Sequence, residues 1–189
     1  MGRVIQFEER AVASLRQRLD AAESANEDLV AFARGHSGAV SSIHRAVLGA
    51  IAADSVEQLL TSVTVDWPRL LGLDVVSFAL VIGGQGFRAD AAGIDFLDPT
   101  LIDRALRGVD AVALRAVPRG HPLFGRDAGK VRAEALIRVG HRGEGSYGLL
   151  ALGHRAPGVV ETGHGAALLR FLGESLDAML RRWSQPPLT

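Results

Sequence analysis

The chain has 189 residues, which suffices for one domain of about 150 residues with an extension, and its formal net charge is zero with neutral histidines. A chain without net charge creates no global field that attracts nucleic acid or an anionic membrane, so neither is expected as a partner. The absence of cysteine excludes thiol catalysis, disulfides, iron–sulfur clusters and cysteine-linked chromophores. A Schiff-base enzyme would have to use Lys130, the single lysine.

Two features of the apolar pattern bear on location. Glu8, Glu9 and Arg10 interrupt the N-terminal segment, which therefore lacks the apolar core of a signal peptide. The longest largely apolar run, 75–82, is far shorter than the roughly 20 residues of a membrane-spanning helix. We therefore expect a cytoplasmic protein that does not enter a membrane.

The first quarter of the chain carries a seam of core positions at alternating steps of three and four residues, from Val12 to Val47. This heptad pattern predicts a coiled-coil helix over residues 1–36 that pairs two copies of the chain. Asn26, at a core position, would fix the register of a parallel pair. The predicted dimer interface consists of Val12, Leu15, Leu19, Ala22, Asn26 and Leu29. The alternative is that this helix folds back on its own domain.

The helices that follow are delimited by breakers and caps. Gly35 and Gly38 predict a kink or break, after which a helix runs to about residue 53. Ser55 and Gln58 fit a capping box that opens the next helix. Pro68 kinks or restarts that helix, and Gly72 ends it.

A sheet follows. The segment 74–82 is β-branched, aromatic and apolar on both faces, which predicts a central, buried strand. The glycines of 83–86 predict a hairpin turn. Asp98 and Pro99 open a short helix, and Glu161 or Thr162 opens a final amphipathic one. The expected strands are 74–82, 87–94, 110–117, 132–141 and 147–154.

This order predicts an α+β domain over residues 37–183, with one mainly antiparallel sheet flanked by helices, and a flexible tail over 184–189. The long first and last helices of the domain would lie together on one face of the sheet. The short helix and the loops would cover the other face.

Several stretches match a known family. They are 4–10, Leu15-Arg16, Leu123-Phe124-Gly125, Ala135-Leu136-Ile137, 148–153 and 171–174. Through them the chain resembles the proteobacterial "domain of unknown function 484" family, a group of GAF-like proteins. The resemblance implies a GAF-like fold behind an N-terminal helix and no established activity. The segments 154–157 and 163–165, in the turn before the last helix, depart from the family pattern. Any role that this turn has in relatives therefore does not carry over to this chain.

GAF domains as a class bind small molecules between the sheet and its covering helices and loops, and many dimerise through terminal helices. The GAF domains that bind cyclic nucleotides resemble one another in a shared Asn-Lys-Phe-Asp-Glu set. Here the single Asn is Asn26 and the single Lys is Lys130, so that ligand is not expected. Bilin-attaching domains need a cysteine. The resemblance therefore implies no particular cofactor.

The sequence gives only weak support for a catalytic or metal-binding site. The six histidines (His36, His44, His121, His141, His154 and His164) lack the spacing of a metal site, so solvated or locally hydrogen-bonded side chains are the favoured interpretation. The 83–86 loop has no G-x-G-x-x-G or Walker pattern. No G-x-S-x-G elbow occurs. We therefore predict that the protein is not an enzyme.

The loop over residues 118–130 is the best candidate for ligand binding. Its basic side chains would face an anionic ligand over the sheet, with an aromatic ring closing the pocket. The candidate residues are Arg115, Arg119, His121 and Phe124, with Arg126 and Lys130 as further cations. Arg115, which projects from a strand, would need a partner if it faces inward. The alternative is a solvated loop that needs charge only for solubility.

Two hypotheses of function follow. The first is a non-enzymatic, homodimeric GAF-like module that acts in regulation or protein interaction. The second is a sensor that binds a small molecule in the GAF-like pocket. Because no kinase, cyclase or DNA-reading motif is visible in the sequence, either would pass its signal through a partner protein.

Overall fold

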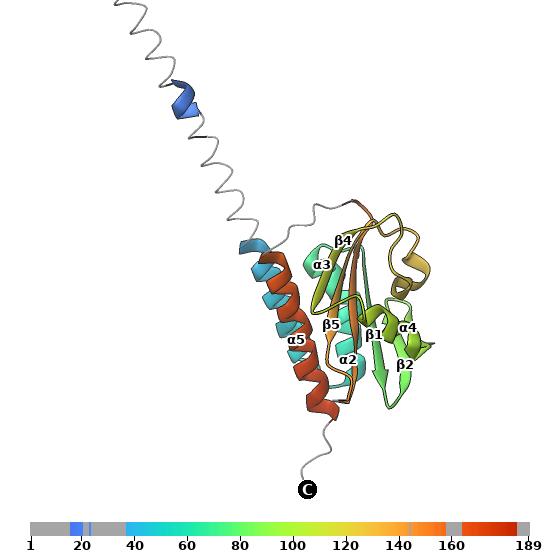
Figure 1. Cartoon of the computed structure of the whole chain (residues 1–189). Helices are drawn as coiled ribbons and strands as arrows, with labels where there is room; N and C mark the ends of the chain where they lie inside the picture. Colours follow the sequence, from blue (N-terminus) through green and yellow to red (C-terminus); the bar gives the residue numbers. More distant parts are fainter. Residues whose placement is uncertain (1–15, 21–22, 24–36, 144, 158–163, 185–189) are drawn as a thin grey trace, which may run out of the picture. The chain divides into compact units, whose positions relative to one another are not determined.

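The computed structural model describes residues 16–20, 23, 37–143, 145–157 and 164–184 (Figure 1). The chain divides into two compact units, Met1–Ser41 and Ser42–Thr189. In the first unit, residues 16–20 are helical and Leu19 is 57% exposed. The other predicted interface residues, Val12, Leu15, Ala22, Asn26 and Leu29, lie outside the described residues. The coiled coil and the boundary after residue 36 therefore stay predictions.

The second unit is built on an antiparallel sheet, with the strand order β3-β2-β1-β6-β5-β4 (Figure 1). The strands are β1 (Val75–Ile82), β2 (Gln85–Asp90), β3 (Gly93–Leu97), β4 (Val112–Ala116), β5 (Ala133–Val139) and β6 (Tyr147–His154). The first strand lies between β2 and β6, and its residues 76–81 are all buried. The predicted antiparallel sheet and its central strand are thus confirmed.

One predicted strand was wrong. The segment 87–94 was expected to form a single strand, but it contains the end of β2, a turn and the start of β3. Asp90 Oδ1 accepts a hydrogen bond of 2.8 Å from the Ala92 backbone N–H, and Gly93 adopts a positive φ of 132°. The side chain of Asp90 thus builds a turn in a segment whose alanines show no turn preference of their own.

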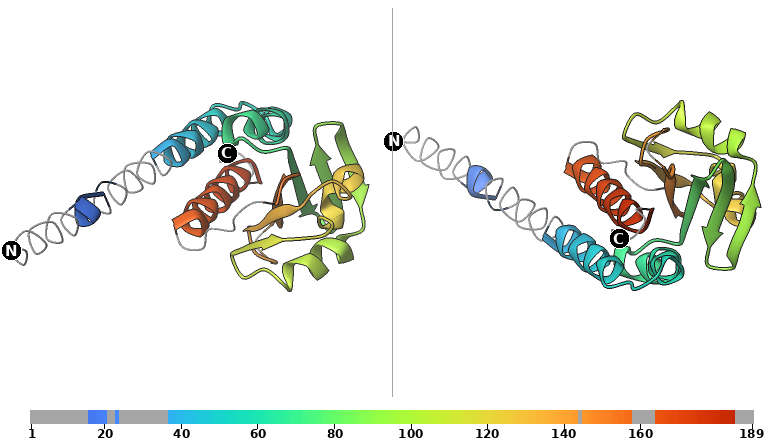
Figure 2. Two further views of the ribbon diagram at one scale, coloured as in Figure 1. Left: turned by 90° about the horizontal axis from the view of Figure 1, so that it is seen from above. Right: turned by 90° about the horizontal axis from the view of Figure 1, so that it is seen from below.

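Helices cover one face of the sheet (Figure 2). They are the helix over residues 37–51, α2 (Val56–Thr61), the π-helical turn η1 (Ser62–Asp66), α3 (Trp67–Leu71) and α5 (His164–Ser184). Ser55 Oγ accepts from the Gln58 N–H at 3.2 Å, which confirms Ser55 as the predicted N-cap. Gln58 Oε1 accepts from the Asp54 N–H at 2.8 Å, one residue before the N–H expected in a capping box. Pro68 lies in the first turn of α3, as predicted, and Gly72 ends that helix with φ 67°.

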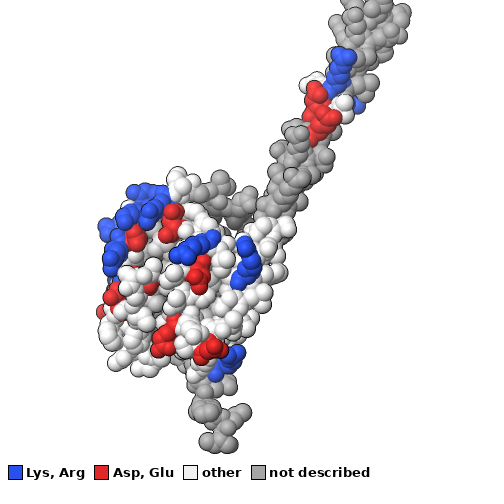
Figure 3. Space-filling model, turned by 180° about the vertical axis from the view of Figure 1, so that it is seen from behind, with Lys and Arg blue, Asp and Glu red and all other residues white. Residues whose placement is uncertain are grey.

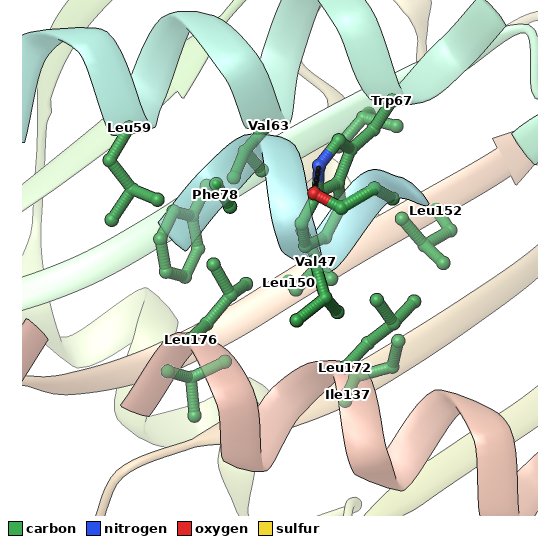
Figure 4. Close-up of a cluster of buried hydrophobic side chains, with 14 of the residues drawn as sticks. Val47, Leu59, Val63, Trp67, Phe78, Ile137, Leu150, Leu152, Leu172 and Leu176 are labelled. Atoms are coloured by element: carbon green, nitrogen blue, oxygen red, sulfur yellow. Dashed lines mark hydrogen bonds between the residues drawn. The ribbon is translucent and has the colours of Figure 1, made fainter. Parts of the chain in front are cut away.

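Trp67 anchors this helical layer. Its ring is fully buried, and Nε1 donates a hydrogen bond of 3.1 Å to the carbonyl of Ala46. Figure 4 shows the surrounding cluster, in which Val47 and Leu172 from two helices meet Leu150 and Leu152 of β6. The first and last helices of the domain therefore share one face of the sheet, as the sequence predicted.

The opposite face is covered by α4 (Pro99–Leu106) and the 3₁₀ helix η2 (Pro122–Asp127). Asp98 Oδ1 accepts from the Thr100 N–H at 2.9 Å and so opens α4, as predicted. A second buried cluster fills the space between these elements and the sheet, with Ile102, Phe124 and Leu149 among its members. Within the described residues, no helix is long and apolar enough to cross a membrane.

Candidate functional site

A buried carboxylate lies at the centre of the region that the sequence pointed to. Glu134 on β5 stands directly opposite Arg115 on β4, and the Glu134 side chain is 1% exposed. Its Oε1 accepts a hydrogen bond of 2.7 Å from Arg115 Nε. Its Oε2 accepts one of 2.6 Å from the backbone N–H of His121. Glu134 therefore fastens the 118–130 loop to the sheet.

His121 opens η2. Its Nδ1 accepts a hydrogen bond of 3.2 Å from the Leu123 N–H, which places the ring proton of the neutral form on Nε2. The pKa of His121 is lowered, chiefly because burial disfavours the charged ring and secondarily because of the Arg115 charge; the Glu134 carboxylate opposes this shift. Neutral His121 is thus the form that caps η2.

We predict that His121 makes the protein less stable in mild acid. Because its pKa is lower in the folded state, the unfolded chain binds the proton more readily, and stability falls as the pH drops below about 6.5. His121→Asn keeps a side-chain acceptor for the Leu123 N–H but cannot titrate. Urea unfolding at several pH values should show a smaller loss of stability in the variant between about pH 7 and pH 5. Identical pH dependence in both proteins would contradict this role.

The four candidate residues of the predicted pocket have different surroundings. Arg115 and His121 meet at Glu134, and the Arg115 side chain is 45% exposed. Arg119 is exposed on the loop, and Phe124 is buried in the cluster beneath η2. The sequence predicted a partner for Arg115 only if this side chain faced inward, and it did not identify the partner. The sequence did contain a sign of this partner, because Glu134 is an acidic residue in the otherwise mainly apolar start of β5. A ligand at these residues stays a prediction.

Side chains occupy the space between the sheet and the layer of α4 and η2. Leu123 and Phe124 of η2 are each 1% exposed, and Leu136, Leu149 and Ala151 of the sheet are buried beneath that layer. A ligand bound there would have to displace these side chains. This layer is therefore a packed core in the present conformation.

A cleft of about 390 Å³ lies beside this core, at the end of α4. Its charged lining consists of Asp103, Arg104, Arg107, Arg138 and Arg142, and the Tyr147 hydroxyl group also lines it. These residues could not be identified from the sequence, because they are spread from residue 103 to residue 147 and form no motif.

The polar groups of this cleft are partly fixed. The Tyr147 hydroxyl donates a hydrogen bond of 3.0 Å to Asp103 Oδ1, and burial together with this bond raises the pKa of Tyr147. Arg142 Nη2 lies 3.6 Å from Asp103 Oδ2. Arg138 donates hydrogen bonds of 2.5–2.8 Å to three backbone carbonyls. They belong to Leu106, the last residue of α4, and to Val109 and Asp110 in the loop after it.

A second cleft, of about 290 Å³, is lined by Asp74, Asp90, Arg126 and Asp127 among others. Its carboxylates have partners: Asp74 Oδ2 lies 3.1 Å from His154 Nδ1, and Asp127 Oδ1 lies 3.0 Å from Lys130 Nζ. The backbone N–H of Arg155 also donates to Asp74 and lowers its pKa. In the described part of the chain, no group of three or more potential metal ligands is found. The carboxylates of this cleft are therefore already engaged by neighbouring residues.

The outer surface differs between faces. Figure 3 shows basic and acidic side chains interspersed over the face that is hidden in Figure 1, in keeping with the zero net charge. On the helical face, Leu48, Ile51 and Phe171 are 64%, 50% and 42% exposed. The rings of His44 and Phe171 pack edge to face, with 6.4 Å between their centroids. The helix over residues 37–51 therefore contacts α5 at this apolar surface.

Solved structures with a similar fold include phytochromes. The chain is similar to the bacteriophytochrome RpBphP3 from the photosynthetic bacterium R. palustris, with 12% sequence identity and a TM-score of 0.51 over 74% of this chain and 37% of that one. It is also similar to the wild-type chromophore-binding domain of the Stigmatella aurantiaca phytochrome P1, with 16% identity and a TM-score of 0.50 over 74% of this chain and 59% of that one. The chain thus spans less than two thirds of either structure.

These matches, together with the antiparallel sheet and its two helical layers, define the fold as GAF-like. Comparison with curated proteins gives no match. The family comparison is decisive: the family described as "protein of unknown function, DUF484" matches residues 1–185. The chain belongs to this family, which confirms the resemblance found in the sequence.

Proposed function

We propose that the protein is a non-enzymatic GAF-like regulatory or interaction module that forms a homodimer through its N-terminal helix. The observation that carries this proposal is the exposed apolar surface on its helices. Leu19 is 57% exposed in the first unit, and its predicted heptad position would place it against a partner helix. Isolated exposed leucines are common on monomers, but the repeat of apolar residues along the predicted seam is typical of a paired helix.

The second unit supports an interaction role independently. Leu48, Ile51 and Phe171 leave apolar side chains exposed on two helices that touch each other. Grouped exposed apolar side chains are typical of surfaces that contact another protein. Such a surface would serve a partner protein or extend the homodimer.

The second candidate function is a small-molecule sensor. One of the similar structures is named a chromophore-binding domain. In this chain the layer between the sheet and η2 is filled by Leu123, Phe124 and their neighbours, which favours the interaction module. Native mass spectrometry of protein purified from cells discriminates the two. A co-purifying small molecule supports the sensor, and its absence supports the module.

We predict that Leu19→Glu converts the homodimer to a monomer. A charge at a core position of a coiled coil loses the apolar contact and must be buried without a partner. Sedimentation equilibrium of the full chain should give the mass of two chains, and that of the variant the mass of one.

Gln17→Glu is the matched control, since it adds the same charge to the same helical turn but off the seam. It should remain dimeric. A monomeric full-length protein would contradict the proposal, and so would a control that dissociates as readily as Leu19→Glu.

A further inference from the structure

The cleft at the end of α4 carries an excess of positive charge. Four arginines line it against one carboxylate, that of Asp103. Asp103 is engaged by the Tyr147 hydroxyl at 3.0 Å and by Arg142 at 3.6 Å. Arg104 and Arg107 form no ion pair with any residue that the structure describes. Arg104 also interacts electrostatically with the Asp98 carboxylate at the start of α4. The lining of the cleft nevertheless holds more cations than carboxylates.

Helix capping explains only one of these arginines. Cations near the C-terminus of a helix are stabilised by its terminal carbonyls, and Arg138 makes this kind of contact with the carbonyls of Leu106 and Val109. Arg104 and Arg107 have no such hydrogen bond among the described residues. Arg104 lies in the last turn of α4 and Arg107 is its C-cap residue, three positions later, so two like charges come close together at some cost. An anion between them would turn this repulsion into attraction.

The remaining groups suit a small organic anion. Arginine presents planar pairs of donors that match the oxygens of a phosphate or carboxylate. The Tyr147 oxygen donates to Asp103 and keeps a lone pair that can accept from a ligand hydroxyl group. A volume of about 390 Å³ lies within the range of small-molecule sites.

We propose that this cleft binds a small organic anion with at least two negative charges, carried by phosphate or carboxylate groups, and that Arg104, Arg107 and Arg142 hold it. The cleft borders the packed layer of α4 and η2, and Leu106 and Tyr147 of that layer form part of its wall, so a ligand can bind against them without displacing a core side chain. All of its residues belong to the second unit of one chain. The proposal therefore does not depend on the homodimer.

Isothermal titration of the full chain with pyrophosphate, and separately with citrate, at an ionic strength of about 0.15 M tests the site. We expect measurable binding of at least one probe, and at least tenfold weaker binding in the double variant Arg104→Gln/Arg107→Gln, because charge-assisted hydrogen bonds are lost. Tighter binding of pyrophosphate assigns the site to phosphates, and tighter binding of citrate assigns it to carboxylates.

The matched control is Arg69→Gln/Arg170→Gln, which removes two exposed arginines from the helical face. It changes the net charge equally and should leave the affinity unchanged. Thermal melting should be alike in all three proteins, since the four guanidinium groups have no ion pair among the described residues. The proposal is overturned if neither probe binds, or if the control weakens binding as much as the cleft variant does.

Discussion

Replacing Gly173 by alanine is expected to lower the free energy of unfolding by about 2 kcal/mol. Gly173 lies on α5 where the helix crosses β5. A Cβ atom at this position would lie 2.6 Å from the Arg138 carbonyl oxygen and 2.7 Å from Ile137 Cγ2. The carbonyl cannot easily withdraw, since β5 is paired with β4 and β6 on its two sides. The helix would therefore have to move away from the sheet.

Gly49→Ala is the control. A Cβ atom there would make an ordinary contact of 3.7 Å with Ser62 Oγ, within the helix over residues 37–51. Alanine is favoured over glycine inside a helix, so this variant should gain about 0.5–1 kcal/mol. Urea denaturation of both variants measures the difference. A stabilised Gly173→Ala protein would show that α5 does not lie as close to the sheet as the structure places it.

The elements that the sequence predicted well are those with a strong local signal. β1 is apolar on both faces and bounded by glycines, and only a strand buried on both sides suits such a run. The cap formed by Ser55 and Gln58 is likewise set by residues three positions apart. Local chemistry of this kind is visible without any knowledge of the tertiary fold.

The features that the sequence did not predict depend on contacts between distant residues. Glu134 is buried because Arg115, nineteen positions earlier, lies opposite it in the register of β4 and β5. The arginines of the cleft come from α4, β5 and the hairpin after β5, and no spacing connects them. Only the folded sheet brings these groups together, so periodicity could not reveal them.

The family resemblance was informative for a related reason. Three of the matching stretches contain glycines at points of close approach. These glycines are Gly125, Gly148, Gly153 and Gly173. Gly125 adopts φ 55° and ψ −126°, and a Cβ atom there would lie 2.5 Å from Arg88 Nη1. At such positions a side chain would strain the backbone or collide with a neighbour, so this packing requires glycine.

Glu134→Ala is expected to lower the free energy of unfolding by about 3 kcal/mol. The substitution removes a carboxylate that accepts from Arg115 Nε at 2.7 Å and from the His121 N–H at 2.6 Å. Arg115 is half exposed and can turn toward water, so part of the loss is recovered there. The backbone N–H of His121 has no such freedom, because His121 also caps η2. The 118–130 loop should therefore loosen before the rest of the domain.

Lys130→Ala separates this effect from the loss of an ordinary ion pair. Lys130 and Asp127 form an exposed pair on the same loop at 3.0 Å, with the Lys130 side chain 61% exposed, and such a pair contributes less than about 1 kcal/mol. Urea denaturation gives the two stabilities, and hydrogen exchange reports the N–H groups of η2. Glu134→Ala should accelerate exchange at Leu123 and Phe124, whereas Lys130→Ala should leave it unchanged. Equal, small effects of both substitutions would mean that Glu134 does not hold the loop. The two variants together thus decide whether the loop over the sheet is fixed by one buried carboxylate or by its surface charges.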